Sequence, residues 1–592
     1  MKKNWILTGH KADYMMVAKK YNIDPVTAII MRNRGVDIEN DDSVRAYLYA
    51  DLSNLYDPHL LKDADVFSVI LEEKVRSQKK IRVITDYDID GVQSSVIAKK
   101  MLRDIGADFD LVIPHRIEDG YGISIDLIKQ AIADGIDTII TCDNGISAIE
   151  PIAYAKENGL TILVTDHHEI PYEEVNGEKE YKHISADAVV NPKQEDCKYP
   201  FKGLCGAAVI WKVSQVVYER FGISKEHYLD TLENVAFATI GDVMELVDEN
   251  RIIVKHGLAC MQNSKSIGLN ALIKEAGLQG TKITSYHIGF VLGPCINASG
   301  RLDTAKLSLE LLEETDEQKA LSLAKTLVEL NTERKALTEE GIKEAENYLI
   351  EHHMLENSVY VIYLPNLHES LNGIVAGKIK EKYYRPTFVL SNGAECIKGS
   401  GRSIEGYSMY DELVKVADYM LGFGGHPLAA GLSIKDEEML QKFYQALLEK
   451  CELTEDELIP KIKIDVAMPL DYISERVISE FELLEPFGNA NKKPVFATKH
   501  AKITSIQVIG ANKDSAKLVL MTDNGYKMTA LLFKRADELK ELLDSSLGES
   551  AWEGLLLRKE VDAFLDIIYY PSVNEFRGIR ELQVIISEFR MS

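Results

Sequence analysis

Short apolar runs alternate with longer amphipathic segments between residues 81 and 190. The runs are rich in β-branched residues, which is the pattern of buried strands, and the segments between them have helical spacing or loop length. Strands separated in this way are typical of a parallel sheet in an α/β fold. The expected strands are residues 81–85, 109–113, 138–142, 161–165 and 188–190.

Carboxylates and imidazoles follow the first, third and fourth of these expected strands. In chain order they are Asp86, Asp88, Asp90, Asp143, Asp166, His167 and His168. Because a parallel sheet binds its ligands beyond the carboxyl ends of its strands, we expect these side chains at one edge of the sheet. Crowded carboxylates repel one another unless protons or cations neutralise them, and a mixture of carboxylate and imidazole suits manganese and similar divalent ions. The pattern therefore predicts a metal site, and bridging aspartates suit a pair of ions.

Other interpretations of these residues remain open. The aspartates of segment 86–91 lie where a helix is expected to begin, so they would also serve as ordinary helix caps. His168 would also fit a core position in which its ring is simply hydrogen-bonded. Downstream, Asp242 follows the largely apolar segment 238–241 and is as compatible with a turn aspartate as with a ligand.

Residues 293–301 form a run of mostly small residues that we expect to be a loop. The run carries an amide, Asn297, and a guanidinium, Arg301. Glycines let a backbone approach a phosphate closely, and arginine binds phosphate through a fixed pair of donors. The run is therefore a candidate phosphate contact.

The remaining regions predict further domains. Residues 304–354 are rich in Glu, Lys and Leu and lack proline, which predicts a long helical connector. A second strand pattern opens near residue 359 and predicts a smaller α/β domain. Its segment 424–431 gathers Gly and Ala around His426, which fits a ligand contact and a structural turn equally well.

The two ends of the chain differ in character. Short strand-like segments from residue 502 onward predict a small β-barrel or sandwich. The first residues show helical patches without recognisable chemistry, so we expect a helical extension that packs on the domain of the first sheet. The expected domains are residues 1–80, 81–303, 304–354, 355–455 and 456–592.

Composition narrows the class of protein. The formal net charge of −25 argues against a protein that coats nucleic acid nonspecifically, although it leaves room for a local basic groove. The seven cysteines are scattered and form no Cys-x-x-Cys pair, which favours a reducing compartment. No apolar run approaches the length of a membrane span, so we expect a cytoplasmic protein.

Taken in order, the motifs resemble those of the DHH phosphoesterase superfamily with its associated C-terminal domain. The motifs are residues 86–91, 143–147, 166–169, 241–242 and 424–431. Within the superfamily the chain is similar to the 5′ to 3′ exonucleases specific for single-stranded DNA. The segments that favour this branch are residues 116–124, 297–301, 399–403 and 484–488. The resemblance spans nearly the whole chain and implies that the final β-domain is an OB-fold.

The resemblance also implies roles for individual residues. Two Mn²⁺ or Mg²⁺ ions would be held by Asp86, Asp88, Asp90, Asp143, His167 and Asp242. Asp143 would bridge the ions, and Asp86 would be either a further ligand or a carboxylate behind the ligands. Asp166 would orient the histidines, and His168 would face the scissile phosphate. The substrate would be gripped by Arg116, Tyr121, Asn297, Arg301, Ser400, Arg402 and His426.

The implied activity is hydrolysis of single-stranded DNA with a 5′-phosphate to 5′-mononucleotides, in DNA repair and recombination. The implied partners are a helicase and a single-strand-binding protein, and the implied state is a monomer. Cys295 stands where the family pattern has arginine, and residues 370–373 also depart from the pattern, which bears on substrate grip.

Two alternatives compete with this interpretation. The first is a DHH phosphodiesterase that acts on short oligonucleotides or cyclic dinucleotides, which would need neither the chain length nor the final β-domain. The second is a non-catalytic scaffold, which would have no use for so many uncompensated carboxylates.

Overall fold

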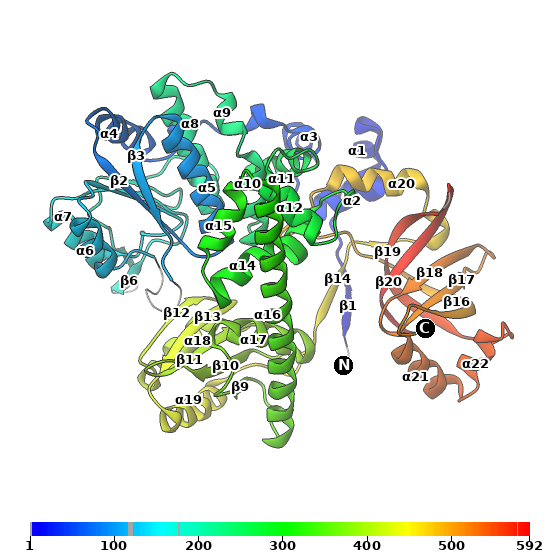
Figure 1. Ribbon diagram of the computed structural model, residues 1–592. Helices are drawn as coiled ribbons and strands as arrows, with labels where there is room; N and C mark the ends of the chain where they lie inside the picture. Colours follow the sequence, from blue (N-terminus) through cyan, green and yellow to red (C-terminus); the bar gives the residue numbers. More distant parts are fainter. Residues whose placement is uncertain (1–2, 116–121, 176–177, 577) are drawn as a thin grey trace.

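The computed structural model describes residues 3–115, 122–175, 178–576 and 578–592 (Figure 1). Its first sheet has the strand order β3-β2-β4-β5-β8, and all of its pairings are parallel. The strands are β2 (Lys80–Thr85), β3 (Asp108–Val112), β4 (Thr138–Cys142), β5 (Thr161–Thr165) and β8 (Ala188–Val190). The prediction of a parallel α/β sheet is confirmed, with every strand within one residue of its expected bounds.

Helices cover both faces of this sheet because successive strand side chains point to opposite faces. In β2, Ile81 and Val83 pack with one helix layer, whereas Ile84 packs with the other. The first layer includes α4 (Ala64–Arg76), α5 (Ile89–Asp104) and α8 (Gly206–Phe221), and the second includes α6 (Ile125–Ala133) and α7 (Ile149–Glu157). The carboxyl ends of the strands therefore form an edge between two layers.

Further helices lead away from this sheet. They are α10 (Leu232–Gly241), α11 (Asp248–Met261), α12 (Ile267–Glu275), α13 (Ser285–His287), the π-helix Ile288–Leu292, α14 (Gly293–Leu302), α15 (Lys306–Glu313) and α16 (Glu317–Glu351). The 35-residue α16 is the expected long connector, and in Figure 1 it runs past the smaller sheet.

The run 293–301 is helical, so the prediction of a loop is wrong. Pro294 lies in the first turn, where a helix does not need the missing N–H. Gly300 then lets the helix touch the loop after β2, since a Cβ there would lie 2.5 Å from the Tyr87 carbonyl oxygen. The small residues serve helix packing rather than a turn.

The second α/β unit, which was predicted, is built on a sheet of order β12-β13-β11-β10-β9. Its elements are β9 (Tyr360–Tyr363), α17 (Asn372–Tyr383), β10 (Thr387–Asn392), β11 (Ile397–Arg402), β12 (Gly422–His426), β13 (Ala429–Ile434) and α19 (Glu437–Lys450). The glycine-rich segment 424–431 belongs to an antiparallel hairpin of β12 and β13. In β11 a Cβ at Gly401 would lie 2.7 Å from the Phe388 ring, so this strand needs glycine where it crosses an aromatic side chain.

The C-terminal strands close into a barrel. They are β16 (Phe496–Ile509), β17 (Ser515–Met521), β18 (Lys527–Leu532), β19 (Phe564–Phe576) and β20 (Ile579–Met591). Closure follows because β16 pairs with β17 on one side and with β19 on the other. The predicted barrel is confirmed. Tyr569 is 1% exposed and donates a hydrogen bond to the Met468 carbonyl, so it belongs to the core.

The N-terminal helices pack against this barrel rather than against the first sheet, where we expected them. Helices α1 (Tyr14–Tyr21), α2 (Pro25–Asn33) and α3 (Asp41–Tyr49) share one apolar core with the barrel, whereas α4 packs on the first sheet. Strand β1 (Asn4–Leu7) also pairs with β14 (Lys461–Ile464). In Figure 1 the dark-blue helices α1 and α2 lie beside the gold α20 (Glu475–Glu480). An apolar helix face predicts burial but does not identify the surface that buries it.

Among the described residues, no helix combines the length and the apolar character that crossing a membrane would require.

Candidate metal centre and nucleic-acid contacts

The turn after β2 combines two roles that the sequence left as alternatives. Asp88 caps α5, because its Oδ1 accepts hydrogen bonds from the backbone N–H groups of Asp90 (2.9 Å) and Gly91 (3.2 Å). A carboxylate has further lone pairs, so this cap leaves Oδ2 for a cation. Gly91 is required where the chain folds back, since a Cβ there would lie 2.2 Å from the Asp86 carbonyl oxygen.

Asp90 is anchored by the N-terminus of α8. Its two oxygens accept the N–H groups of Gly206 (2.6 Å) and Ala207 (2.8 Å), which suits a negative charge at a helix N-terminus. Gly206 has a second role, since a Cβ there would lie 2.6 Å from Asp143 Oδ1. Gly206 was not among the residues predicted from the sequence. The small-residue run 204–208 was the available signal, but only the fold brings it to the acidic cluster.

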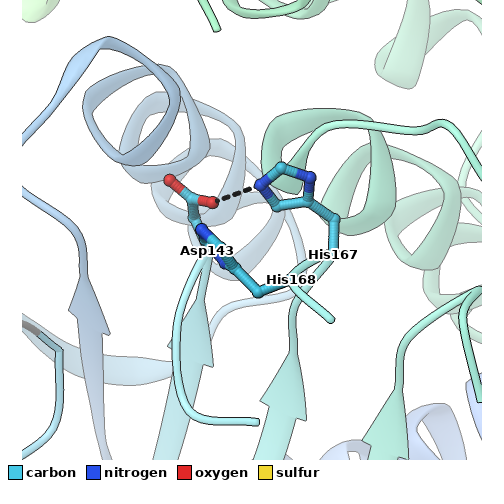
Figure 2. A group of neighbouring side chains, drawn as sticks. All are labelled: Asp143, His167 and His168. Atoms are coloured by element: carbon cyan, nitrogen blue, oxygen red, sulfur yellow. Dashed lines mark ion pairs between the residues drawn. The ribbon is translucent and has the colours of Figure 1, made fainter. Parts of the chain in front are cut away.

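His167 is the centre of the acidic cluster. Its Nε2 lies 3.1 Å from Asp143 Oδ1, 3.6 Å from Asp90 Oδ2 and 3.8 Å from Asp242 Oδ2. Figure 2 shows the Asp143 carboxylate directed at the His167 ring, with His168 beside them. These residues come from the ends of β4 and β5, from the first turn of α5 and from the C-terminus of α10, so the fold joins segments that lie far apart in the sequence.

Asp166 holds the neighbouring histidine. Its Oδ1 accepts the backbone N–H groups of His167 (2.7 Å) and His168 (3.1 Å) and lies 2.7 Å from His168 Nδ1, while Oδ2 accepts the Ile146 N–H at 2.9 Å. Burial raises the pKa of Asp166, but the His168 hydrogen bond and charge outweigh burial and lower it to about 2. Burial also lowers the pKa of His168, and the bond to Asp166 reverses this and raises it to about 9. In the absence of a cation, these two shifts favour a carboxylate paired with an imidazolium.

The surroundings of Asp143 and Asp242 oppose the ionisation of these two carboxyl groups. Burial, followed by the charges of Asp90 and Asp88, raises the pKa of Asp242 to about 8. Burial and the same two charges raise the pKa of Asp143 well above its usual range. Burial lowers the pKa of His167 to about 4, so its ring is neutral and available as a ligand. Divalent cations would relieve the repulsion that these shifts express.

The donor atoms form groups of the size that a cation needs. In each group the ligand atoms lie within 4.8 Å of one another, and the groups are Asp86–Asp88–Asp143, Asp90–His167–Asp242 and Asp143–His167–His168. Asp143 belongs to two of them, which suits a carboxylate shared between two ions. The residues present therefore fit two divalent cations with mixed oxygen and nitrogen ligands, as Mn²⁺ prefers.

Three of the predicted substrate-binding residues, Ser400, Arg402 and His426, lie on the smaller sheet. Arg402 Nη1 donates to Ser400 Oγ (2.9 Å) and to the Gly401 carbonyl (2.7 Å), and among the described residues no carboxylate pairs with this guanidinium. Burial lowers the pKa of Arg402. His426 is exposed, and both it and Arg402 pair in register with Ala429, so the two side chains lie at one end of the sheet.

The remaining predicted contacts behave differently. Arg301 Nη1 donates to the Ser370 carbonyl at 2.7 Å and so joins α14 to the second unit. Asn297 Oδ1 accepts the Ile89 N–H at 2.9 Å and so supports the turn that carries the aspartates. Cys295 is buried, with its Sγ 3.4 Å from Asn331 Nδ2. Arg116 and Tyr121 lie outside the described residues.

Comparisons with known proteins cover nearly the whole chain. Family descriptions match three successive regions, namely the DHH family N-terminal domain over residues 80–239, the DHHA1 domain over 356–453 and the RecJ OB domain over 464–588. The chain is 32% identical over 580 residues to the single-stranded-DNA-specific exonuclease RecJ of Bacillus subtilis, covering 97% of this chain and 69% of that protein. It is 32% identical over 556 residues to the exonuclease of the same name from Haemophilus influenzae, covering 90% and 92%.

A solved structure agrees with these matches. RecJ from Thermus thermophilus in complex with Mn²⁺ superposes with a TM-score of 0.80 at 25% identity, covering 99% of this chain and 79% of that chain.

Proposed function

Because this chain belongs to the RecJ family of DHH phosphoesterases, we propose that it is an exonuclease that hydrolyses single-stranded DNA from the 5′ end with two divalent cations at the acidic cluster. The observation that carries the proposal is the position of Asp143, which contributes to both an oxygen-rich donor group and a group containing His167. When bound, the cations would supply a hydroxide near neutral pH and stabilise charge on the attacking and leaving oxygens.

We propose that the metal ligands are Asp86, Asp88, Asp90, Asp143, His167 and Asp242. The protein prepares this set before substrate arrives, since backbone N–H groups already fix Asp88 and Asp90. Asp166 fixes the His168 ring through Nδ1, and we assign to His168 Nε2 the role of donating to a non-bridging oxygen of the scissile phosphate. His168, Asp166 and Asp143 are thus the residues we assign to catalysis.

We propose that Arg301, Ser400, Arg402 and His426 grip the 5′-terminal phosphate and the adjacent backbone, together with Arg116, Tyr121 and Asn297. Support comes from Arg402. Among the described residues, its half-buried guanidinium donates hydrogen bonds only to neutral groups. A guanidinium without a carboxylate is a favourable phosphate contact. The barrel would guide the single strand toward the cluster.

We further propose that the protein acts as a monomer in DNA repair and recombination. A helicase would supply the single strand, and a single-strand-binding protein would cover it. The free state of its cysteines fits a cytoplasmic site of action.

The decisive experiment supplies Mn²⁺ or Mg²⁺ and compares 5′-phosphorylated single-stranded DNA, duplex DNA and dinucleotides as substrates. We expect release of mononucleotides from the single strand and little from the duplex. Hydrolysis confined to dinucleotides would overturn the proposal in favour of a phosphodiesterase for short substrates.

A further inference from the structure

We infer that Tyr286 and Phe290 form a base-stacking platform for the single strand beside the metal centre. The inference rests on the proposed function. Both aromatic side chains are largely in solvent, with Tyr286 63% and Phe290 68% exposed. Val243, which follows the C-cap of the helix on which the π-helix packs, is 67% exposed. Apolar groups of this size are usually buried, so their joint exposure next to a candidate active site calls for an occupant.

The backbone presents the two rings as one surface. Residues Ile288–Leu292 form a π-helix between α13 and α14, a rare conformation that is found frequently at functional sites. The Tyr286 and Phe290 rings are stacked, with centroids 5.1 Å apart and planes at 28°. A stacked pair that is open to solvent offers a flat π-face, which every nucleobase can use.

The platform is attached to the metal cluster on one side. The π-helix packs on α10, which is capped at its C-terminus by Asp242, and Val243 follows that ligand directly. Gly289 lies against this helix, since a Cβ there would be 3.9 Å from Ile240 Cγ2. A base on the platform would therefore belong to a nucleotide close to the scissile phosphate.

The platform is attached to the barrel side as well. Ser285 Oγ donates to the Phe487 carbonyl, Asn489 Nδ2 donates to the Val243 carbonyl at 2.9 Å, and the Leu246 N–H donates to the Asn489 carbonyl at 2.9 Å. Segment 487–489 leads into the barrel. The platform thus lies between the acidic cluster and the barrel, where the proposed path of the strand passes, and this continuity identifies the occupant as bases rather than another protein.

The test compares the double variant Tyr286→Ala/Phe290→Ala with the full-length wild type in Mn²⁺. Stacking on aromatic side chains contributes roughly enough to change affinity tenfold. We therefore expect KM for a 5′-phosphorylated oligonucleotide to rise about tenfold and kcat to change little. A 2-aminopurine base near the 5′ end should lose its stacking quench in the variant. Tyr49→Ala, which removes a 54% exposed aromatic from α3, is the matched control and should leave both readings unchanged.

An oligonucleotide with abasic residues near its 5′ end tests whether the effect on KM comes from stacking of the bases. Wild type should show the raised KM on this substrate, and the double variant should show no further loss. An unchanged KM on normal DNA, or an equal loss on abasic DNA, would overturn the platform while wild-type exonuclease activity leaves the proposed function intact. Self-association of the wild-type protein but not of the double variant in sedimentation would also overturn the platform, because Tyr286 and Phe290 would then bind a second copy of the chain.

Discussion

The acidic cluster of the first sheet and the basic residues of the smaller sheet are suited to ligands of opposite charge. Asp90, Asp143 and His167 are between 1% and 7% exposed and are held by backbone contacts or by one another. Arg402 and His426 lie on sheet strands with less burial, and in the described part of the chain their hydrogen bonds go to neutral groups. The first region is therefore prepared for cations before substrate arrives, whereas the second is left for an anion. Substitutions in the two regions should therefore have different effects on metal binding, turnover and DNA affinity.

Asp143→Asn should have the largest effect because it removes the charge that two donor groups share. The stabilisation that a metal ion gives a developing charge is several kcal/mol, so we expect mononucleotide release from single-stranded DNA to fall by about a thousandfold or more. Affinity for the same strand, measured by anisotropy, should change little because the basic residues are intact.

The same variant provides an independent measurement without substrate. The metal-free protein should melt at a higher temperature, since the change removes a carboxyl group whose ionisation is opposed by burial and by the neighbouring carboxylates. Near-normal turnover, or loss of DNA affinity equal to the loss of turnover, would contradict the separation of the two regions.

Gly206→Ala tests the support behind the cluster. The new Cβ would lie 2.6 Å from Asp143 Oδ1, and so the carboxylate must move while every ligand remains. Such support is typically worth a factor of roughly ten to a hundred in metal affinity. Calorimetric titration with Mn²⁺ should show this loss, and excess Mn²⁺ should restore part of the activity. Gly222→Ala adds a Cβ in open space at the C-cap of the same helix, where φ is +67°, so it strains the helix end without touching the cluster and is a control for lost helix stability.

Arg402→Gln tests the other region. Losing a charged hydrogen bond costs about 1.5 kcal/mol or more, so KM for 5′-phosphorylated DNA should rise roughly tenfold. The preference for a 5′-phosphate over a 5′-hydroxyl should fall, while Mn²⁺ affinity stays at the wild-type value. If Mn²⁺ affinity falls instead, Arg402 belongs to the metal region and the comparison fails.

The two regions also differ in how far the sequence could predict them. The strands of the first sheet were predictable because apolar runs with regular spacing are local signals, and their ends place Asp86, Asp143 and Asp166 at one edge. The assignment of Asp88 to cap or ligand was not predictable, since one carboxylate performs the first role and leaves an oxygen for the second.

Long-range contacts account for what was missed. Gly206 reaches the cluster only through the packing of α8 on the sheet. The run 293–301 is a helix, in which Gly300 allows close approach to the Tyr87 carbonyl. The N-terminal helices have apolar faces that fit any core, and only the fold pairs them with the barrel. The exposure of the Phe290 side chain could likewise not be predicted, because an aromatic residue in a sequence is expected to be buried.

The smallest effect is expected for a substitution of Asn297, which lies between the two regions. The resemblance places it with the substrate contacts, but its Oδ1 accepts the Ile89 N–H in the turn that carries the aspartates. A hydrogen bond contributes about 1 kcal/mol net, so Asn297→Ala should weaken Mn²⁺ binding roughly fivefold if this bond is its main role. KM for single-stranded DNA at saturating Mn²⁺ should then equal that of wild type. The reverse result, a raised KM with unchanged Mn²⁺ affinity, would move Asn297 to the phosphate side and extend the basic region into α14.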